Sequence, residues 1–174
     1  MNPFSLLKED HKKVKGLFEE FEALGDRAHK QKQAIVEKVI PELEVHTQVE
    51  EEIFYPAVKQ SVDKEGKHLI VEAFEEHAIV KRLLEELKGL SPEDEKYEAK
   101  FKVVMDSVKH HIKEEENELF PEAKEAIGDE ADELGERMEE RKMELMEDMG
   151  LPQAKPKKPA TKRQGHGNQT HASR

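Results

Sequence analysis

Apolar residues recur along most of the chain at alternating intervals of three and four, the spacing that places them on one face of an α-helix. Four such series, which we call seams, run over residues 4–21, 35–57, 73–87 and 101–119. The segments between them are short, which favours antiparallel neighbours. The pattern therefore predicts an all-α protein in which four helices form an antiparallel up-down bundle.

Prolines mark expected interruptions of these helices. Pro41, Pro56 and Pro121 fall inside the seams, and each should kink or end its helix because proline lacks the backbone N–H that a helix needs. Ser91 followed by Pro92 has the form of a helix start, with a capping hydroxyl and proline at the first helical position. The fourth helix is therefore expected to begin there.

A fifth segment, residues 129–149, follows Gly128 and is highly charged, with a few apolar residues at helical spacing. It is predicted to form a peripheral helix lying across the bundle. The expected organisation is a four-helix bundle over residues 1–126, an accessory C-terminal helix over 127–150 and a disordered basic tail over 151–174.

The composition narrows the class of protein. Charged residues make up 40% and hydrophobic residues 35%, so the chain lies near the disordered range and the seams decide in favour of a fold. The lack of cysteine excludes disulfides and thiolate ligands. No run of 18 apolar residues is present, and charges interrupt the N-terminus before a secretory signal could form. We expect a cytoplasmic protein that does not enter the membrane.

The net charge of −11 is unevenly distributed. Residues 151–174 contain six basic and no acidic residues, so the first 150 residues carry 23 basic and 40 acidic groups. The tail is interpreted as a solubilising segment, or as one that folds back on the acidic body. Nucleic-acid contact is the alternative, but six charges without aromatic partners do not lead us to expect it.

The sequence repeats itself once. Residues 46–56 align without gaps on residues 111–121, and residues 10–21 align on 76–87. The bundle is therefore expected to consist of two copies of one helical hairpin. Each copy places one lone histidine and one His-x-x-x-Glu pair in its seams.

Six polar residues occupy seam positions where leucine or isoleucine would pack best. His46 and Glu50 lie one helical turn apart on the same face. A buried carboxylate without a partner is very costly, so these groups must satisfy one another or a cation. The six residues, all predicted metal ligands, are His11, His46, Glu50, His77, His111 and Glu115.

Four imidazoles and two carboxylates form a nitrogen and oxygen donor set that suits iron, manganese or zinc. If Glu50 and Glu115 each bridge two octahedral ions, coordination positions remain open, which indicates a reactive site rather than a structural one. A single seam histidine would more often be a hydrogen-bonded core residue. The repetition of the pattern favours a metal centre.

Several neighbours are expected to surround this centre. Glu51 and Glu116 also occupy equivalent positions in the two repeats, but each points about 100° around the helix from the preceding predicted ligand. They should therefore be solvated or lie behind the ligands, with direct ligation as the alternative. His110 has no partner in the first repeat and is assigned to the surface or to the surroundings of the centre. Tyr55 and Phe120 are core candidates. The other histidines, expected to be solvated, are His29, His68, His166 and His171.

This order of residues resembles the hemerythrin-like HHE cation-binding family over roughly residues 5–125. The resemblance implies a four-helix bundle holding a non-haem di-iron centre, bridged by oxide or hydroxide and by both carboxylates. Family members bind oxygen, sense oxygen or redox state, handle iron, or respond to peroxide and nitric oxide. The motifs that carry the resemblance are Asp10-His11, His46-x-x-x-Glu50-Glu51 with Phe54-Tyr55-Pro56, Glu76-His77, and His111-x-x-x-Glu115-Glu116 with Leu119-Phe120-Pro121.

Two departures separate the chain from the oxygen-carrying hemerythrins. Lys81 stands where the carriers have a fifth histidine, and Glu115 and Glu116 stand four and five residues after the last histidine, where carriers use an aspartate at five. The resemblance then implies a more symmetric and more open site. It also makes exchange of iron for manganese or zinc plausible.

The sequence thus leads to a cytoplasmic di-iron binding protein that binds or responds to oxygen, peroxide or nitric oxide. Two alternatives stay open. One is a di-iron peroxidase or catalase-like oxidoreductase in stress defence. The other is a metal-dependent sensor that reaches an unspecified protein partner through the fifth helix or the basic tail.

Overall fold

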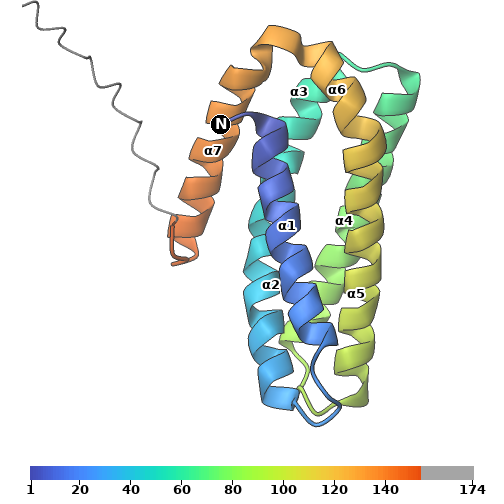
Figure 1. Ribbon diagram of the computed structural model, residues 1–174, viewed down its shortest axis with the longest axis vertical. Coiled ribbons are helices and arrows are strands. Elements are labelled where there is room, and N and C mark those ends of the chain that lie inside the picture. The colour runs from blue at the N-terminus through green and yellow to red at the C-terminus, as the bar shows by residue number, and fades with distance from the viewer. Residues whose placement is uncertain (154–174) are drawn as a thin grey trace, which may run out of the picture.

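The structure, a computed structural model, describes residues 1–153 and contains no strand in that range. Four long helices lie side by side along the long axis of the molecule (Figure 1). The predicted all-α up-down bundle is confirmed. Its helices are α1 (Pro3–Glu22), α2 (His29–Val49), α4 (Lys64–Lys88) and α5 (Glu95–Glu114).

Shorter elements extend α2 and α5 at the same end of the bundle. A π-helical turn follows each of these helices, and the chain then continues as a short α-helix before it turns. A final helix, α7, packs against α1 and α2 outside the bundle (Figure 1). These elements are η1 (Glu50–Phe54), α3 (Tyr55–Lys59), η2 (Glu115–Leu119), α6 (Phe120–Ile127), η3 (Gly128–Glu130) and α7 (Ala131–Asp148).

The core consists of two apolar clusters, one toward each end of the bundle. Leu7 and Val49 belong to one cluster, and Val14 and Leu43 belong to the other. On α1 and α2 the helical turn that carries His11 or His46 separates the two clusters. In the second repeat, His77 and His111 lie between the same two clusters. The polar seam positions therefore form a layer across the middle of an otherwise apolar core.

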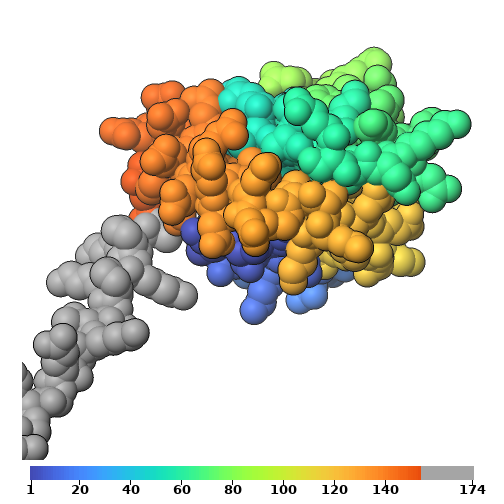
Figure 2. Space-filling model, turned by 90° about the horizontal axis from the view of Figure 1, so that it is seen from above, coloured from blue at the N-terminus to red at the C-terminus, as the bar shows by residue number. Residues whose placement is uncertain are grey.

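Helix α7 adds its apolar face to one of these clusters through Leu134, Met138 and Leu145. It also lies very close to the start of the chain. A Cβ atom added at Gly135 would lie 1.8 Å from the backbone oxygen of Met1, so only glycine permits this approach. Figure 2 shows α7 (orange to red) covering the side of the molecule beside the blue N-terminal residues.

The prolines act differently from one another. The helix α2 continues through Pro41 without ending. Pro56 and Pro121 each take the second position of a short helix directly after a π turn. A π turn holds one residue more than an α-helical turn, and this change in bonding accommodates the N–H that proline lacks. The chain therefore stays helical where a kink or a break was expected.

The start of α5 differs from the expectation. Asp94, not Ser91, is the N-cap, and its carboxylate accepts a hydrogen bond of 2.8 Å from the Lys96 N–H. Ser91 instead opens a turn, in which the Asp94 N–H donates to the Ser91 carbonyl at 3.0 Å. The Asp94 carboxylate also places a negative charge at the positive end of the helix, which is favourable.

The predicted basic tail lies outside the described residues from residue 154 onward. Among the residues that the structure describes, no helix is both long enough and apolar enough to cross a membrane.

Candidate metal centre

The polar layer brings together all six predicted donor residues. They come from α1, α2, α4 and α5 and from the first residues of η1 and η2. Their exposed fractions range from 0% at Glu50 to 7% at His111. Six ionisable groups are therefore withdrawn from water in the middle of the bundle, as the seams predicted.

The donors form two groups that share a carboxylate. His11, His46, Glu50 and Glu115 have ligand atoms that all lie within 4.8 Å of one another. In this first group His11 Nε2 lies 3.2 Å from Glu115 Oε2, and His46 Nε2 lies 3.2 Å from Glu50 Oε1. Two atoms bound side by side to one octahedral ion at about 2.1 Å would lie about 3 Å apart, so the spacing fits a cation.

The second group contains Glu50, His77 and His111. Here the other oxygen of Glu50, Oε2, lies 3.2 Å from His77 Nε2. Glu115 also turns its second oxygen this way, with Oε1 3.5 Å from His111 Nε2. Each carboxylate thus presents one oxygen to each histidine pair, the arrangement that two bridging carboxylates require.

Three buried atoms of the first group have no hydrogen-bond partner. They are His11 Nε2, Glu50 Oε1 and Glu115 Oε2. His11 Nε2 and Glu115 Oε2 lie 3.2 Å apart, yet they form no hydrogen bond with each other. Buried polar atoms are rarely left without a partner. Lone pairs that converge on one point without bonding to each other fit a cation at that point.

A carboxylate also holds the outer nitrogen of each histidine. Because an ionised carboxylate can only accept, each Nδ1 donates to it, and an imidazole that is neutral then turns its Nε2 lone pair toward the centre. This is the arrangement that most metal-binding histidines show. The pairs, with their Nδ1 to oxygen distances, are His11 with Glu116 at 2.8 Å, His46 with Asp10 at 3.1 Å, His77 with Glu51 at 3.1 Å and His111 with Glu76 at 3.2 Å.

We call Asp10, Glu51, Glu76 and Glu116 the outer carboxylates. Their positions show that Glu51 and Glu116 lie behind the histidines, which is one of the three expected places. Two of the four are themselves held by lysines. Lys142 of α7 donates to Asp10, and Lys81 donates to Glu51 at 2.5 Å. Lys81, at the position of the carriers' fifth histidine, therefore binds an outer carboxylate.

Without a cation, the centre is held by charged pairs. Burial would lower the pKa of His46, but the Glu50 carboxylate and the hydrogen bond with Asp10 raise it to about 10. Burial would raise the pKa of Glu115, but His111 and His11 hold it well below its usual range. The metal-free centre thus favours a protonated His46 beside ionised carboxylates, and a cation has to displace that proton.

Tyr55 places its hydroxyl between the donors of the second group. The oxygen donates to Glu115 Oε1 at 2.5 Å and lies 3.2 Å from both Glu50 Oε2 and His111 Nε2. The π turn makes this possible. The Tyr55 N–H bonds to the carbonyl of Glu50, five residues back, so Tyr55 is brought round toward the face that carries Glu50.

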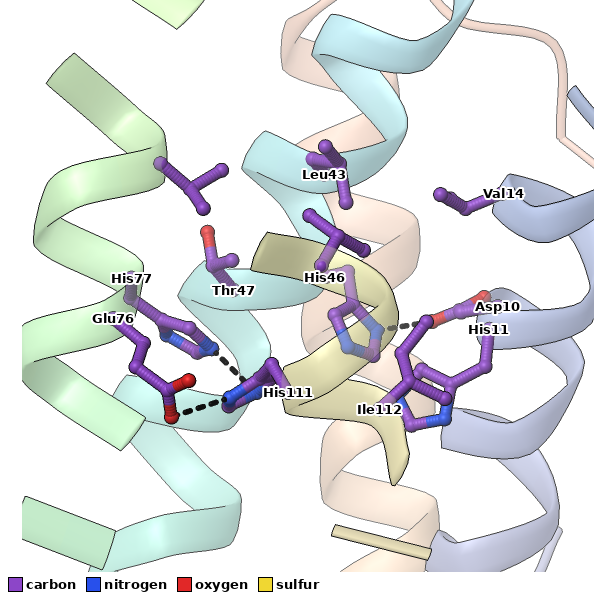
Figure 3. A pocket seen from close by; sticks show the side chains of 12 residues that line it. Asp10, His11, Val14, Leu43, His46, Thr47, Glu76, His77, His111 and Ile112 are labelled. Atoms are coloured by element: carbon purple, nitrogen blue, oxygen red, sulfur yellow. Dashed lines mark hydrogen bonds and ion pairs between the residues drawn. The ribbon is translucent and has the colours of Figure 1, made fainter. Parts of the chain in front are cut away.

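A small apolar cavity lies against the histidines. Val14, Leu43, Val80 and Val108 line it together with the imidazoles, and its volume is about 20 Å³. Figure 3 shows Val14 and Leu43 on one side of the cavity and the four histidines on the other. A cavity of this size holds one small molecule of about the size of water. The apolar walls exclude larger polar molecules.

Sequence reasoning missed part of this arrangement. Asp10 and Glu76 directly precede histidines in the two repeats and helped to carry the family resemblance, but no contact with a histidine was predicted for them. Tyr55 was expected in the core, but its hydroxyl was not expected beside the carboxylates of Glu50 and Glu115. No sequence pattern pointed to Lys142, because it lies in α7 and contacts Asp10 only in the folded protein. His110 is exposed, and the surface was one of the two places expected for it.

Comparison with known proteins agrees with the geometry. A DNA nickase from Nostoc sp. (strain PCC 7120) is 31% identical over 120 residues, which are 69% of this chain and 33% of that protein. The chain thus spans about a third of the length of this relative. A crystal structure of a Hemerythrin HHE cation binding domain-containing protein from Mycobacterium kansasii matches with a TM-score of 0.71 and 27% identity, over 85% of this chain and 89% of that one.

The family called Hemerythrin, described as the Hemerythrin HHE cation binding domain, matches residues 2–123. This range contains every donor residue and every outer carboxylate described above. The chain therefore belongs to the hemerythrin HHE cation-binding family.

Proposed function

We propose that this chain is a di-iron protein that binds or responds to oxygen, peroxide or nitric oxide. The observation that carries the proposal is the sharing of Glu50 and Glu115 between two buried histidine pairs. His11 and His46 would hold one ion, and His77 and His111 would hold the other.

The donor set favours iron without excluding related ions. Neutral imidazole and carboxylate ligands suit Fe, Mn and Zn, and soft sulfur ligands are lacking. Bound iron would supply redox chemistry and coordination positions that the protein leaves free. Manganese or zinc remain possible substitutes in the same cage.

The chain's own residues prepare the centre for a small ligand. The outer carboxylates fix the imidazoles with Nε2 inward, and the apolar cavity admits one small molecule and keeps bulk water out. The Tyr55 hydroxyl holds a proton 2.5 Å from Glu115 Oε1, so a proton donor stands beside the bridging carboxylates. These features support binding of a diatomic molecule or peroxide.

The DNA nickase extends far beyond the region that matches this chain, so its activity is not carried over. The alternatives within the proposal are reversible binding, sensing and peroxide turnover. The basic tail and α7 are the segments through which a sensor would reach a protein partner.

The experiment is anaerobic loading with ferrous iron, followed by separate exposure to oxygen, nitric oxide and hydrogen peroxide. Absorption changes that saturate at one small molecule per two irons would support a binding protein. Steady consumption of peroxide would instead support the peroxidase or catalase-like alternative. An iron-loaded protein whose spectrum none of the three molecules changes would contradict the proposal.

A further inference from the structure

The second repeat carries three further potential metal ligands at the surface. Glu76 of α4 and both His110 and Glu114 of α5 have ligand atoms within 4.8 Å of one another. His110 Nε2 lies 3.1 Å from Glu114 Oε1, one helical turn away. The His110 side chain is 63% exposed, whereas Glu76 and Glu114 are about a quarter to a third exposed. We call these three residues the surface triad.

The first repeat has nothing like the triad. By the alignment of the repeats, His110 and Glu114 correspond to Val45 and Val49, which are 3% and 1% exposed. Those valines belong to the apolar cluster that α7 completes. Helix α7 covers the α1–α2 side of the bundle, and the equivalent α4–α5 side carries the triad instead.

A small cavity of about 10 Å³ is shared by residues of the triad and of the buried centre. Glu76 and Glu114 of the triad line it together with His111 and Glu115 of the centre. The Glu115 side chain is only 3% exposed, and its Oε1 lies 3.5 Å from His111 Nε2. The cavity thus lies against two donor residues of the buried centre.

Charge also distinguishes the two sides. On the α7 side, Lys142 neutralises the outer carboxylate Asp10 and would repel a cation. On the α4–α5 side, no lysine or arginine within residues 1–153 makes a salt bridge to Glu76 or Glu114. Surface carboxylates without a lysine or arginine partner raise the local concentration of cations.

We propose that Glu76, His110 and Glu114 form a surface site for a divalent transition-metal ion, and that the ion passes from it between α4 and α5 to His111 and Glu115. One imidazole and two carboxylates match the donor preference of Fe²⁺, Mn²⁺ and Zn²⁺. Glu76 links the two sites, because it also accepts the hydrogen bond from His111 Nδ1. The inference rests on the proposed buried centre and assigns the route by which it is filled.

The test compares the rate of metal uptake in two matched double variants. His110→Gln with Glu114→Gln removes two ligands of the triad and keeps side-chain size. His68→Gln with Glu72→Gln removes an equally spaced, exposed His and Glu pair elsewhere on α4. Fe²⁺ is mixed anaerobically with each metal-free protein, and uptake is followed by competition with a coloured chelator. Circular dichroism verifies that both variants are folded.

We expect the triad variant to fill about tenfold more slowly, because charge-lined clefts raise association rates by about 10–10³-fold. Its final metal content should equal that of the unaltered protein, and the control variant should fill at the unaltered rate. Equal rates for triad variant and unaltered protein, or equal slowing in both variants, would overturn the inference while leaving the proposed function intact. Absence of uptake by the unaltered protein would overturn both.

Discussion

Tyr55 and Phe120 occupy equivalent positions in the two repeats but meet the centre differently. The Tyr55 hydroxyl donates to Glu115 Oε1 at 2.5 Å on the side of His77 and His111. The Phe120 ring stacks on the His11 ring, with centroids 5.9 Å apart and planes 6° from parallel. The two halves of a nearly symmetric centre therefore differ by one polar atom.

Tyr55→Phe should lower the free energy of unfolding of the metal-free protein by about 1–3 kcal/mol, because buried carboxylate oxygens lose their donor. Phenylalanine fits this position, as the second repeat shows, so the fold should persist. Urea unfolding measures the change. Tyr97→Phe is the control, since Tyr97 is buried in the other apolar cluster. A loss no larger than that of the control would contradict the assigned role of the hydroxyl.

Asp10→Asn should weaken metal binding by about 10–100-fold, the usual effect of losing the group that orients a ligating histidine. Lys142→Met should weaken it less, because Asp10 keeps its charge and its contact with His46. Arg141→Met is the matched control, since Arg141 lies beside Lys142 and pairs with Glu52 and Glu144 at the surface. Competition with a chelator measures affinity. Equal affinities for all three variants would show that α7 and Asp10 do not support the centre.

The stability of the metal-free protein should depend on pH in a defined direction. The pKa of His46 is raised to about 10, so its contribution is complete below about pH 6.5 and is lost as pH rises toward 10. The pKa of Glu115 is lowered, so its contribution is present above about pH 4.5 and is lost as pH falls below that value. Urea unfolding between pH 4 and 10 should show a maximum between about 4.5 and 6.5. His46→Gln should flatten the alkaline side.

Bound metal should counteract the loss of stability at high pH, because an imidazole must lose its proton to bind a cation and does so more readily as pH rises. Iron bound at 100 times its dissociation constant should raise Tm by about 5–10 °C for a chain of this size. The difference should grow from pH 6 to pH 8, and thermal unfolding with and without a chelator measures it. Identical melting of the metal-free and loaded forms at both pH values would contradict a cage formed by the six donors.

The seams and the repeat were enough to predict the bundle, and they singled out the six residues that the structure brings together in one buried layer. A histidine such as His46 in an otherwise apolar seam is costly unless it has a partner, so the pattern itself points to the site. The repeat then fixes which glutamates are paired. Local periodicity carries this information because each donor lies one or two turns from apolar neighbours on the same helix.

What the sequence did not predict depends on contacts between distant segments. Lys142 reaches Asp10 across 132 positions, and no local pattern records that contact. The π turns before Pro56 and Pro121 were read as breaks, because the seams assume a regular helix. Tyr55 reaches the carboxylates only because of such a turn.

The most direct test of the account is the location of bound metal in a crystal of the iron-loaded protein. An anomalous difference map recorded at the iron edge should show two peaks per chain. One peak should lie among His11, His46, Glu50 and Glu115, and the other among Glu50, His77, His111 and Glu115. A single peak in this layer, or iron bound only outside it, would contradict the shared-carboxylate centre.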